Sequence, residues 1–381
     1  MVQWIEQGGA REARWHSERG APPPKRVIIA DDRMTADEAY GHACQGVALL
    51  WRGDFHNARQ MLIALANRAD RSQRRSGKTL AALGSAAIAA AFHLERQARA
   101  QRARTLAMLL IEVAEDLSID LRRAPDIRLS LSAALGSGAG SVLMSLRALL
   151  GVIGAHEWSI KGIDIPAVGG RIHPHYGVFA PIRAEYVELV ATAPLPEVLA
   201  CCDLAFDIGT GTGVLAAVLA RRGVGRLLAT DQDPRALACA RDNLGRLGLL
   251  AGVEVQQADL FPDGRAALIV CNPPWLPARP SSPLEHAIYD PDSRMLLAFL
   301  HGLATHLVPG GEGWLILSDL AEHLGLRSRA SLLAAIEAAG LTVVDRIDAR
   351  PTHPRASDKA DPLYAARKAE VTSLWRLRQG A

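Results

Sequence analysis

The sequence predicts an α/β protein in which an all-helical N-terminal domain precedes a largely parallel sheet. In the C-terminal half, short apolar runs alternate with helical patterns, which is typical of parallel strands joined by right-handed crossovers. The last two apolar runs have no long helical pattern after them, which favours an antiparallel edge. From about residue 35 to 150, by contrast, apolar residues recur at helical spacing and no strand-like alternation interrupts them.

Seven strands are expected in the C-terminal half: Leu204–Ile208, Arg226–Thr230, Val253–Gln256, Ala267–Cys271, Trp314–Leu317, Leu341–Ile347 and Val371–Leu377. The helical prediction upstream depends on one face in particular, formed by Leu106, Leu109, Leu110, Val113 and Leu117. The chain is therefore divided into a flexible tail (1–30), a helical domain (31–155), a connecting β-hairpin (156–175) and the sheet domain (176–381). The hairpin is predicted from Trp158–Ile165, a glycine turn and Arg171–His173.

Composition excludes several classes of protein. Forty-nine per cent hydrophobic content in 381 residues supplies a core for two domains, and the net charge of +3 permits a nucleic-acid partner without requiring one. The five cysteines show no C-x-x-C spacing, so neither a zinc site nor a disulfide framework is indicated and we expect a cytoplasmic protein. No signal peptide is expected at the N-terminus, and the uncharged stretch 129–146 is too rich in serine and glycine to suggest a membrane span.

A glycine-rich loop, "FDIGTGTGVLA", follows the first strand of the sheet domain and precedes a helix. Its glycines, Gly209, Gly211 and Gly213, allow a tight turn and let a ligand approach bare backbone. Counted from Gly211, the same stretch reads G-x-G-x-x-A, a variant of the dinucleotide-binding motif. A glycine-rich turn without a ligand is the structural alternative.

Two acids extend this pattern. Asp231 ends the second strand, 22 residues after Gly209, where a carboxylate can accept hydrogen bonds from ribose hydroxyls. Asp259 follows the third strand, in a position to accept a bond from an adenine amino group. Each acid alone could equally be a helix cap or a loop carboxylate. Together with the glycines they predict a cofactor that contains a nucleoside.

The fourth strand ends in the rigid elbow "VCNPPWLP". The side-chain oxygen of Asn272 and the carbonyl of Pro273 supply two acceptors, which the proline pair Pro273–Pro274 holds fixed and which suit the two donors of an –NH₂ group. Trp275 offers a flat face for a planar amide or base. Holding both N–H bonds out of plane localises the lone pair of a planar nitrogen and aims it at an electrophile. Nothing in this elbow assists hydride transfer.

In this order, Gly209-x-Gly211-x-Gly213, Asp231, Asp259 and Asn272-Pro273-Pro274-Trp275 resemble the class I S-adenosylmethionine-dependent methyltransferases. Within this class, the residues resemble the N-methylating "small domain" group, which includes release-factor glutamine methyltransferases and guanine and adenine RNA methyltransferases. The resemblance covers roughly residues 175–320. It implies a Rossmann-like seven-stranded sheet with an antiparallel last strand, S-adenosyl-L-methionine as cofactor, and an upstream domain that recognises the substrate.

The resemblance also implies roles for single residues. Asp207 and the three glycines would surround the methionine part of the cofactor, Asp231 the ribose and Asp259 the adenine. Asn272, Pro273, Pro274 and Trp275 would form the catalytic elbow. The segment "YGVFAPIRAEYVELV" would line the cofactor pocket with Phe179 and Arg183, and Arg183 and Glu185 match a pair in the glutamine enzymes. Ile182 and Trp275 depart from that pattern, where proline and tyrosine are usual.

The acceptor stays open at this stage: a protein glutamine, an RNA base or a small metabolite. A basic cluster could dock RNA phosphates or an acidic protein, or be a solvated face. It consists of Arg68, Arg71, Arg74, Arg75, Lys78, Arg96, Arg99, Arg102 and Arg104, against Asp70 and Glu95.

Glu285, His286 and Tyr289 in a proline-rich loop are candidate substrate contacts. His173 and His175 lack a third ligand at metal-binding spacing, so no metal is expected. A non-catalytic binding protein and a nicotinamide oxidoreductase remain the alternatives.

Overall fold

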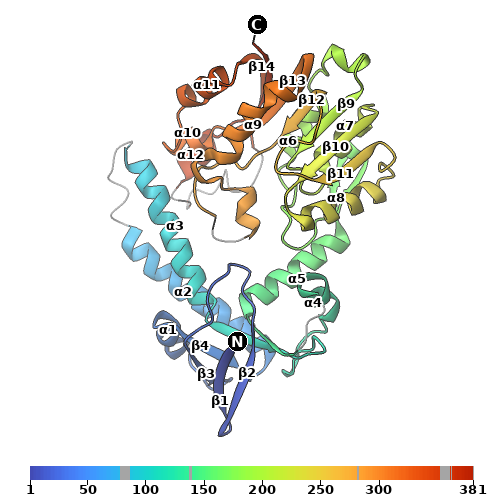
Figure 1. The fold of residues 1–381 in the computed structure, drawn as a ribbon. Helices are drawn as coiled ribbons and strands as arrows, with labels where there is room; N and C mark the ends of the chain where they lie inside the picture. Colours follow the sequence, from blue (N-terminus) through green and yellow to red (C-terminus); the bar gives the residue numbers. More distant parts are fainter. Residues whose placement is uncertain (78–85, 137–139, 281–282, 352–360, 362, 381) are drawn as a thin grey trace. The chain divides into compact units, whose positions relative to one another are not determined.

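The computed structural model describes residues 1–77, 86–136, 140–280, 283–351, 361 and 363–380. Contacts between Cα atoms divide the chain into two compact units, Met1–Glu157 and Trp158–Ala381. Figure 1 shows the helices and strands of both units. The second unit contains the glycine loop and the elbow.

The second unit is built on a seven-stranded sheet with the order β11-β10-β9-β12-β13-β15-β14. Its strands are β9 (Leu204–Ile208), β10 (Arg226–Asp231), β11 (Val253–Gln257), β12 (Ala266–Cys271), β13 (Leu307–Ser318), β14 (Leu341–Ala349) and β15 (Thr372–Gln379). β15 runs antiparallel to both of its neighbours, whereas β9 to β13 pair in parallel. The prediction of a Rossmann-like sheet with an antiparallel last strand is confirmed, and each predicted strand overlaps an observed one.

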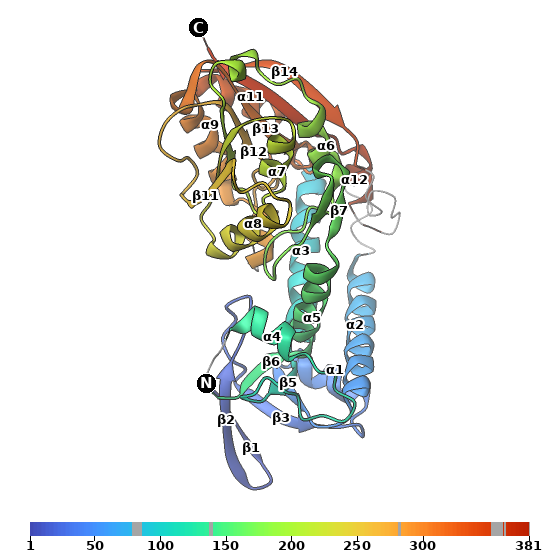
Figure 2. The ribbon, with the colours of Figure 1, turned by 90° about the vertical axis from the view of Figure 1, so that its right-hand side faces the viewer.

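Helices cover both faces of this sheet (Figure 2). One face carries α6 (Ala184–Thr192), α7 (Val214–Arg221) and α8 (Pro234–Arg246), and the other carries α9 (Arg294–His306) and α11 (Arg329–Ala338). Strand β12 shows why two layers are needed: Leu268 and Val270 point into the first core, and Ile269 and Cys271 into the second. Both faces of a parallel strand are buried, which is why its sequence reads as an uninterrupted apolar run.

The chain leaves the sheet at two neighbouring strand ends. The last residue of β12, Cys271, pairs with the last residue of β9, Ile208. Asn272 and Gly209, which follow them, therefore start side by side at the carboxyl edge. Because the chain winds outward from β9 through β10 and β11 and then crosses back to β12, this is the switch point at which open α/β sheets bind ligands.

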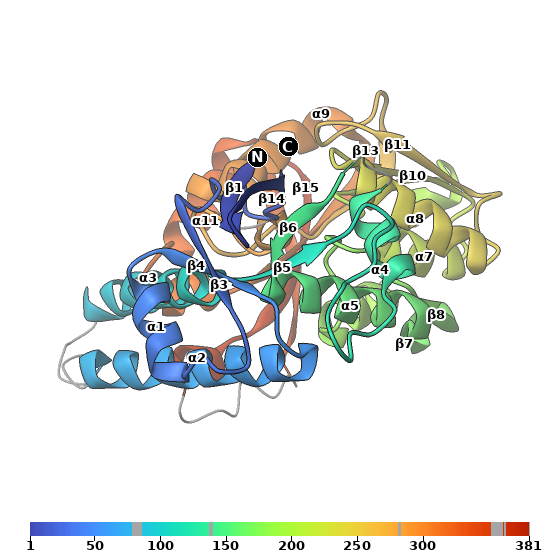
Figure 3. The same ribbon diagram turned by 90° about the horizontal axis from the view of Figure 1, so that it is seen from below.

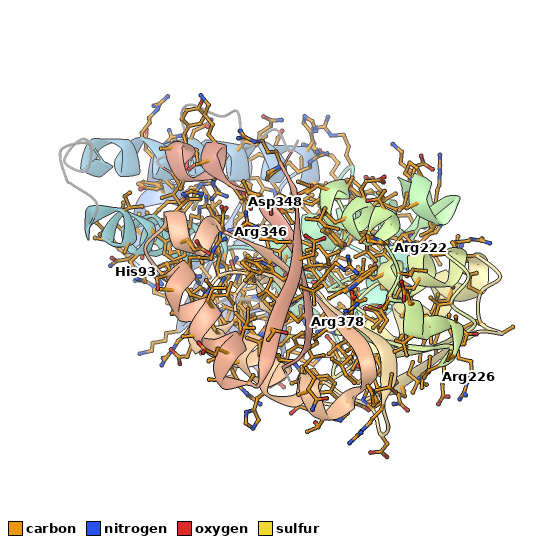
Figure 4. All side chains as sticks on the ribbon, turned by 90° about the horizontal axis from the view of Figure 1, so that it is seen from above. His93, Arg222, Arg226, Arg346, Asp348 and Arg378 are labelled. Carbon is orange, nitrogen blue, oxygen red and sulfur yellow. The ribbon has the colours of Figure 1, made fainter. Side chains whose placement is uncertain are left out.

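Charged side chains hold the antiparallel strand in place. Glu312 on β13 is fully buried, and its carboxylate accepts hydrogen bonds from Trp314, Arg376 and Arg378. These contacts hold the pKa of Glu312 below its usual value, against the opposing effect of burial. Figure 4 labels Arg378 on β15, and on the outer strand β14 it labels Arg346 and Asp348, which pair at 2.8 Å.

The first unit contains a sheet as well, of six strands in the order β1-β2-β6-β5-β4-β3. These are β1 (Val2–Glu6), β2 (Gly9–Trp15), β3 (Arg26–Ala30), β4 (Val47–Trp51), β5 (Leu109–Val113) and β6 (Val142–Ser145). The predictions of a flexible tail over 1–30 and an all-helical domain over 31–155 are therefore wrong. All five residues of β4 are buried, and such a short apolar run cannot be distinguished from a buried helix by its spacing.

The helices of the first unit are α1 (Ala36–Cys44), α2 (Phe55–Gly77), α3 (Ala86–Leu106), α4 (Arg128–Leu135) and α5 (Leu146–Lys161), the last of which continues into the second unit. Figure 3 shows α2 and α3 side by side. The predicted helical face from Leu106 to Leu117 is split: α3 ends at Leu106, and the next leucines belong to β5.

The expected hairpin is shorter than predicted. An antiparallel pair, β7 (Ile163–Ile165) and β8 (Gly170–Ile172), lies in this region, but residues 158–161 belong to α5. Within the uncharged stretch 129–146, α4 and β6 form, and residues 137–139 fall outside the described residues. Among the helices that the structure describes, none combines the length and apolarity needed to cross a bilayer.

Candidate active site at the carboxyl edge of the second sheet

The glycine loop adopts a conformation that side chains disfavour. Gly209, Gly211 and Gly213 have φ angles of 71°, 54° and 80°, all in the left-handed region. A Cβ atom at Gly213 would lie 3.2 Å from Ala240 in α8, so this glycine allows close packing of two helices. At Gly211 the nearest atom to such a Cβ is the Gly209 carbonyl oxygen at 4.0 Å. Gly211 therefore presents backbone that a ligand can approach.

Asp207 holds this loop from beneath. It is buried, and its Oδ2 accepts bonds from Thr210 Oγ1 at 2.6 Å and from the Ala216 amide at 3.0 Å. Since α7 has no side-chain cap at Gly213, the carboxylate satisfies one of the free N–H groups of its first turn. Burial raises the pKa of Asp207 to about 6. The observed contacts of Asp207 thus lie within the fold and shape the glycine loop.

This contact bears on the choice of cofactor. A dinucleotide places its pyrophosphate at the N-terminus of the helix that follows the glycine loop. Here a buried carboxylate of the chain already occupies the first turn of α7, at Ala216. A second concentration of negative charge would be repelled, so the site suits a nucleoside cofactor without phosphates better than a dinucleotide.

Asp231 lies at the end of β10, next to the glycine loop. Its Oδ2 accepts a bond from the Gly211 amide at 3.1 Å, and its Oδ1 one from the Asp233 amide at 3.0 Å. Burial raises the pKa of this carboxyl. Open backbone at Gly211 and a carboxylate beside it fit a ribose that carries two hydroxyl donors. Asp259 is placed differently: its side chain is 75% exposed and lies 3.9 Å from Arg294.

The elbow after β12 is rigid and anchored. Leu276 pairs with Tyr289 in an isolated bridge, and the Asp290 amide donates to the Leu276 carbonyl at 2.9 Å. Asp290 is buried and accepts bonds from the Met295 and Leu296 amides at the start of α9. The loop that follows the elbow thus returns to it before entering α9.

Within the elbow, Asn272 and Trp275 contact each other. The indole Nε1 of Trp275 donates to Oδ1 of Asn272 at 2.9 Å. Asn272 and Trp275 are half-buried and Pro273 is buried. The hydrogen bond uses one lone pair of Oδ1 and leaves the other for a further donor.

Arg183 covers the ring of Trp275, with its guanidinium carbon 4.6 Å from the ring centroid. Its nitrogens donate to Glu185 at 2.5 Å, Glu370 at 2.9 Å and Thr372 at 3.3 Å. Sequence reasoning paired Arg183 with Glu185 but missed Glu370 and Thr372. Glu370 is 187 residues away along the chain, and no local pattern signals such a contact.

The remaining predicted residues are dispersed. Phe179 is half-buried. His173 Nδ1 lies 2.8 Å from the Ser159 carbonyl, and His175 Nε2 lies 3.3 Å from Asp242. Across the described residues, no group of three or more His, Cys, Asp or Glu is arranged to hold a metal. His286 is exposed within a short 3₁₀ turn, Pro283–Ala287.

The basic cluster is partly neutralised. Arg68 pairs with Asp37 at 2.7 Å, and Arg102 with Asp70 at 2.6 Å. Arg99 pairs with Glu95. Lys78 and the side chains of Arg74 and Arg75 lie outside the part of the chain that the structure describes. These ion pairs reduce the positive charge that the cluster could offer to phosphates.

Comparison with known proteins agrees with this geometry. Residues 171–328 match the family model of the methyltransferase small domain. This part of the chain is a methyltransferase small domain. The match identifies S-adenosylmethionine as the cofactor of the methyltransferase domain, and the nicotinamide alternative is set aside.

Two curated relatives resemble the methyltransferase domain. A "Ribosomal protein L11 methyltransferase" of Pelotomaculum thermopropionicum is 37% identical over 143 residues, which cover 37% of this chain and 39% of that protein. A "Release factor glutamine methyltransferase" of Cereibacter sphaeroides is 33% identical over 159 residues, which cover 38% of this chain and 55% of that protein. The match thus spans about two fifths of one relative and just over half of the other.

One solved structure, a ribosomal protein L11 methylase from Lactobacillus delbrueckii subsp. bulgaricus, shares 18% identity. The comparison covers 52% of this chain and 79% of that one, with a TM-score of 0.34. This similarity is too low to bear on function.

Proposed function

We propose that this protein transfers a methyl group from S-adenosylmethionine to a planar nitrogen of a macromolecule, with a protein side-chain amide as the favoured acceptor. The observation that carries the proposal is the elbow at Asn272–Trp275, which leaves the sheet beside the glycine loop. When bound, the cofactor would supply an electrophilic methyl group. As the N–CH3 bond forms, its S–CH3 bond would break, S-adenosylhomocysteine would leave, and the acceptor nitrogen would lose one of its two protons to solvent.

Different residues would bind the cofactor and the acceptor nitrogen. Gly211 and Asp231 would hold the nucleoside, and Asp207 shapes the loop that carries Gly211. The free lone pair of Asn272 Oδ1 and the carbonyl of Pro273 would accept the two N–H bonds of an –NH₂ group. With both N–H bonds fixed, the nitrogen lone pair points out of the plane of the acceptor. Orientation of the acceptor, rather than a strong base, would then supply most of the rate gain.

Two observations favour a protein acceptor over RNA. The names of both relatives specify protein targets, a ribosomal protein and a release factor. In addition, three arginines of the basic cluster are already paired with carboxylates, which weakens the case for phosphate contacts. The first unit is the part of the chain available to recognise such a protein, because the family match begins only at residue 171.

The test is methyl transfer from radiolabelled S-adenosylmethionine into an extract of cells that lack this protein, followed by digestion with protease or RNase. We expect label in a protein band that protease destroys and RNase leaves. Acid hydrolysis then distinguishes the nitrogen: an N-methylated amide releases labelled methylamine, whereas a methylated amine keeps its label.

Other outcomes overturn parts of the proposal. Label that RNase destroys would replace the protein acceptor with an RNA base. Label confined to small molecules would make this a metabolite methyltransferase. Complete absence of transfer, with cofactor binding intact, would favour a non-catalytic cofactor-binding protein.

A further inference from the structure

We infer that Arg183 is a positioning residue that fixes Asn272 through the indole ring of Trp275, rather than a contact to the cofactor. This inference rests on the proposed function, since it assigns Asn272 the accepting nitrogen. It concerns how the elbow acquires its geometry and replaces the earlier expectation for Arg183.

The first step is the chain of contacts. Arg183 lies over one face of Trp275, and the N–H of the same ring donates to Asn272 Oδ1. A carboxamide can rotate about its terminal torsion, which is broad and roughly two-fold. The indole N–H can satisfy only the oxygen, so it selects the orientation in which Oδ1, and not the NH₂ group, faces Trp275. The position of the ring therefore determines where the remaining lone pair of Asn272 points.

The second step is the rigidity of Arg183. Its side chain is 19% exposed, and those of Glu185 and Glu370 are 6% and 5% exposed. Glu370 also accepts a 2.6 Å bond from Ser318 Oγ at the end of β13. The guanidinium is thus held by Glu185 at the start of α6, by Glu370 just before β15 and by Thr372 at the start of β15, while Ser318 at the end of β13 fixes Glu370. A side chain with this many partners offers the indole a fixed surface.

Arg183 leaves only the opposite face of the Trp275 ring open to an acceptor. With Arg183 on one face, Trp275 cannot stack on an acceptor with that face. A guanidinium also makes the ring a poorer partner for a cationic acceptor on the opposite face, because the attraction of a cation depends on the ring's negative face. The arrangement is therefore suited to a neutral planar acceptor, in agreement with the proposed amide.

Three variants test this chain. Arg183→Met removes the guanidinium. Trp275→Phe keeps a ring beneath Arg183 and leaves its ion pairs intact, but removes the N–H donor. Arg222→Met is the matched control: Arg222, which Figure 4 labels, lies over Trp314 at 5.8 Å and binds the carbonyls of Val190 and Ala193.

Steady-state kinetics give the first readout. We expect Arg183→Met and Trp275→Phe each to lower kcat about tenfold or more, with smaller changes in KM, because the acceptor still binds but is poorly oriented. Their combination should be far from additive if both act through Asn272. Affinity for S-adenosylhomocysteine should stay within about twofold, and Arg222→Met should lower the melting temperature without lowering kcat.

A second readout needs no turnover. Tryptophan labelled at the indole nitrogen gives NMR signals for the seven tryptophans, and Trp275→Phe identifies the signal of Trp275. In the wild-type protein this N–H should exchange slowly with solvent. Arg183→Met should accelerate its exchange, whereas Arg222→Met should leave it unchanged.

The outcomes separate the two proposals. Weaker S-adenosylhomocysteine binding by Arg183→Met with normal kcat would make Arg183 a cofactor contact. Unchanged kcat together with an unchanged Trp275 N–H would remove any positioning role. If the wild-type protein transfers no methyl group, the proposed function fails, and the NMR measurement still decides whether Arg183 fixes Trp275.

Discussion

The indole nitrogen of Trp275 donates a 2.9 Å hydrogen bond to the side-chain oxygen of Asn272. An aromatic residue in this elbow can therefore do more than offer a flat surface, since it also sets the orientation of the amide three residues earlier. The two residues are three positions apart, and Pro273 and Pro274, whose φ angles are fixed by their rings, lie between them. We propose that these four consecutive residues form a pre-arranged hydrogen-bond acceptor for the nitrogen to be methylated.

The cofactor site gives the first prediction. Asp231→Ala should weaken binding of S-adenosylhomocysteine about 100-fold, because two charge-assisted hydrogen bonds are each worth about 1.5–3 kcal/mol before compensation. Isothermal titration calorimetry measures the change. Asp263→Ala, which alters an exposed aspartate in a neighbouring loop, is the control and should bind normally. Equal affinities of the two variants would exclude Asp231 from the site.

The glycine loop gives a second prediction, with its own matched control. Gly211→Ala and Gly223→Ala both place a side chain at positive φ, 54° and 89°, in open space. Each should lower the free energy of unfolding by about 1–2 kcal/mol. Only Gly211→Ala should also weaken S-adenosylhomocysteine binding, by about tenfold or more, because its Cβ lies where the ligand approaches. Parallel loss of affinity in both variants would show that strain alone is responsible.

Asp207 gives a third prediction, for stability against pH. Its pKa of about 6 exceeds the unfolded value of 3.8, so between these values the folded state binds more protons than the unfolded state. The free-energy cost of folding with a buried charge at Asp207 is thus fully present above pH 6 and disappears as the pH falls below 4. As the pH falls from about 6 to about 4, the free energy of unfolding of the wild-type protein should therefore rise, relative to that of Asp207→Asn, by up to about 3 kcal/mol.

Urea denaturation of the two proteins at about pH 7 and about pH 4.5 measures this difference. Comparison with Asp207→Asn cancels the other titrating groups of the chain. If the difference in free energy of unfolding between wild type and Asp207→Asn stayed constant with pH, Asp207 would titrate normally. If the wild-type protein instead lost stability relative to the variant at the lower pH, the charge of Asp207 would be stabilised by the loop.

The centre of the sheet of the second unit could be predicted because β9 and β12 are largely apolar runs, each followed within two residues by a glycine or proline that does not continue a strand easily. Gly209 and Pro273 mark two such ends, and the motif residues sit there because the carboxyl ends of neighbouring parallel strands share one edge. The contact of Asn272 with Trp275 could not be predicted, since it depends on side-chain orientation. Nor could the contact of Arg183 with Glu370, which brings together residues 187 positions apart.

The sheet of the first unit was missed for a different reason. Leu109–Val113 follows a long helix directly, and its leucines continue the helical spacing of that helix. Four of its five residues are buried, so the alternation that reveals a half-exposed strand is absent. In the N-terminal thirty residues, the pair Gly8–Gly9 and the proline run 22–24 indicated a tail, and strand β2 exposes most of its side chains.

Asn272→Ala tests whether Asn272 holds the nitrogen that accepts the methyl group. Labelled methyl transfer into the extract and S-adenosylhomocysteine affinity are measured on the same preparations of wild-type and variant protein. We predict that transfer falls at least about 100-fold, as when an oriented polar group is lost from a transition state, while the affinity changes less than about threefold. Near-normal transfer by Asn272→Ala would show that Asn272 does not hold the accepting nitrogen.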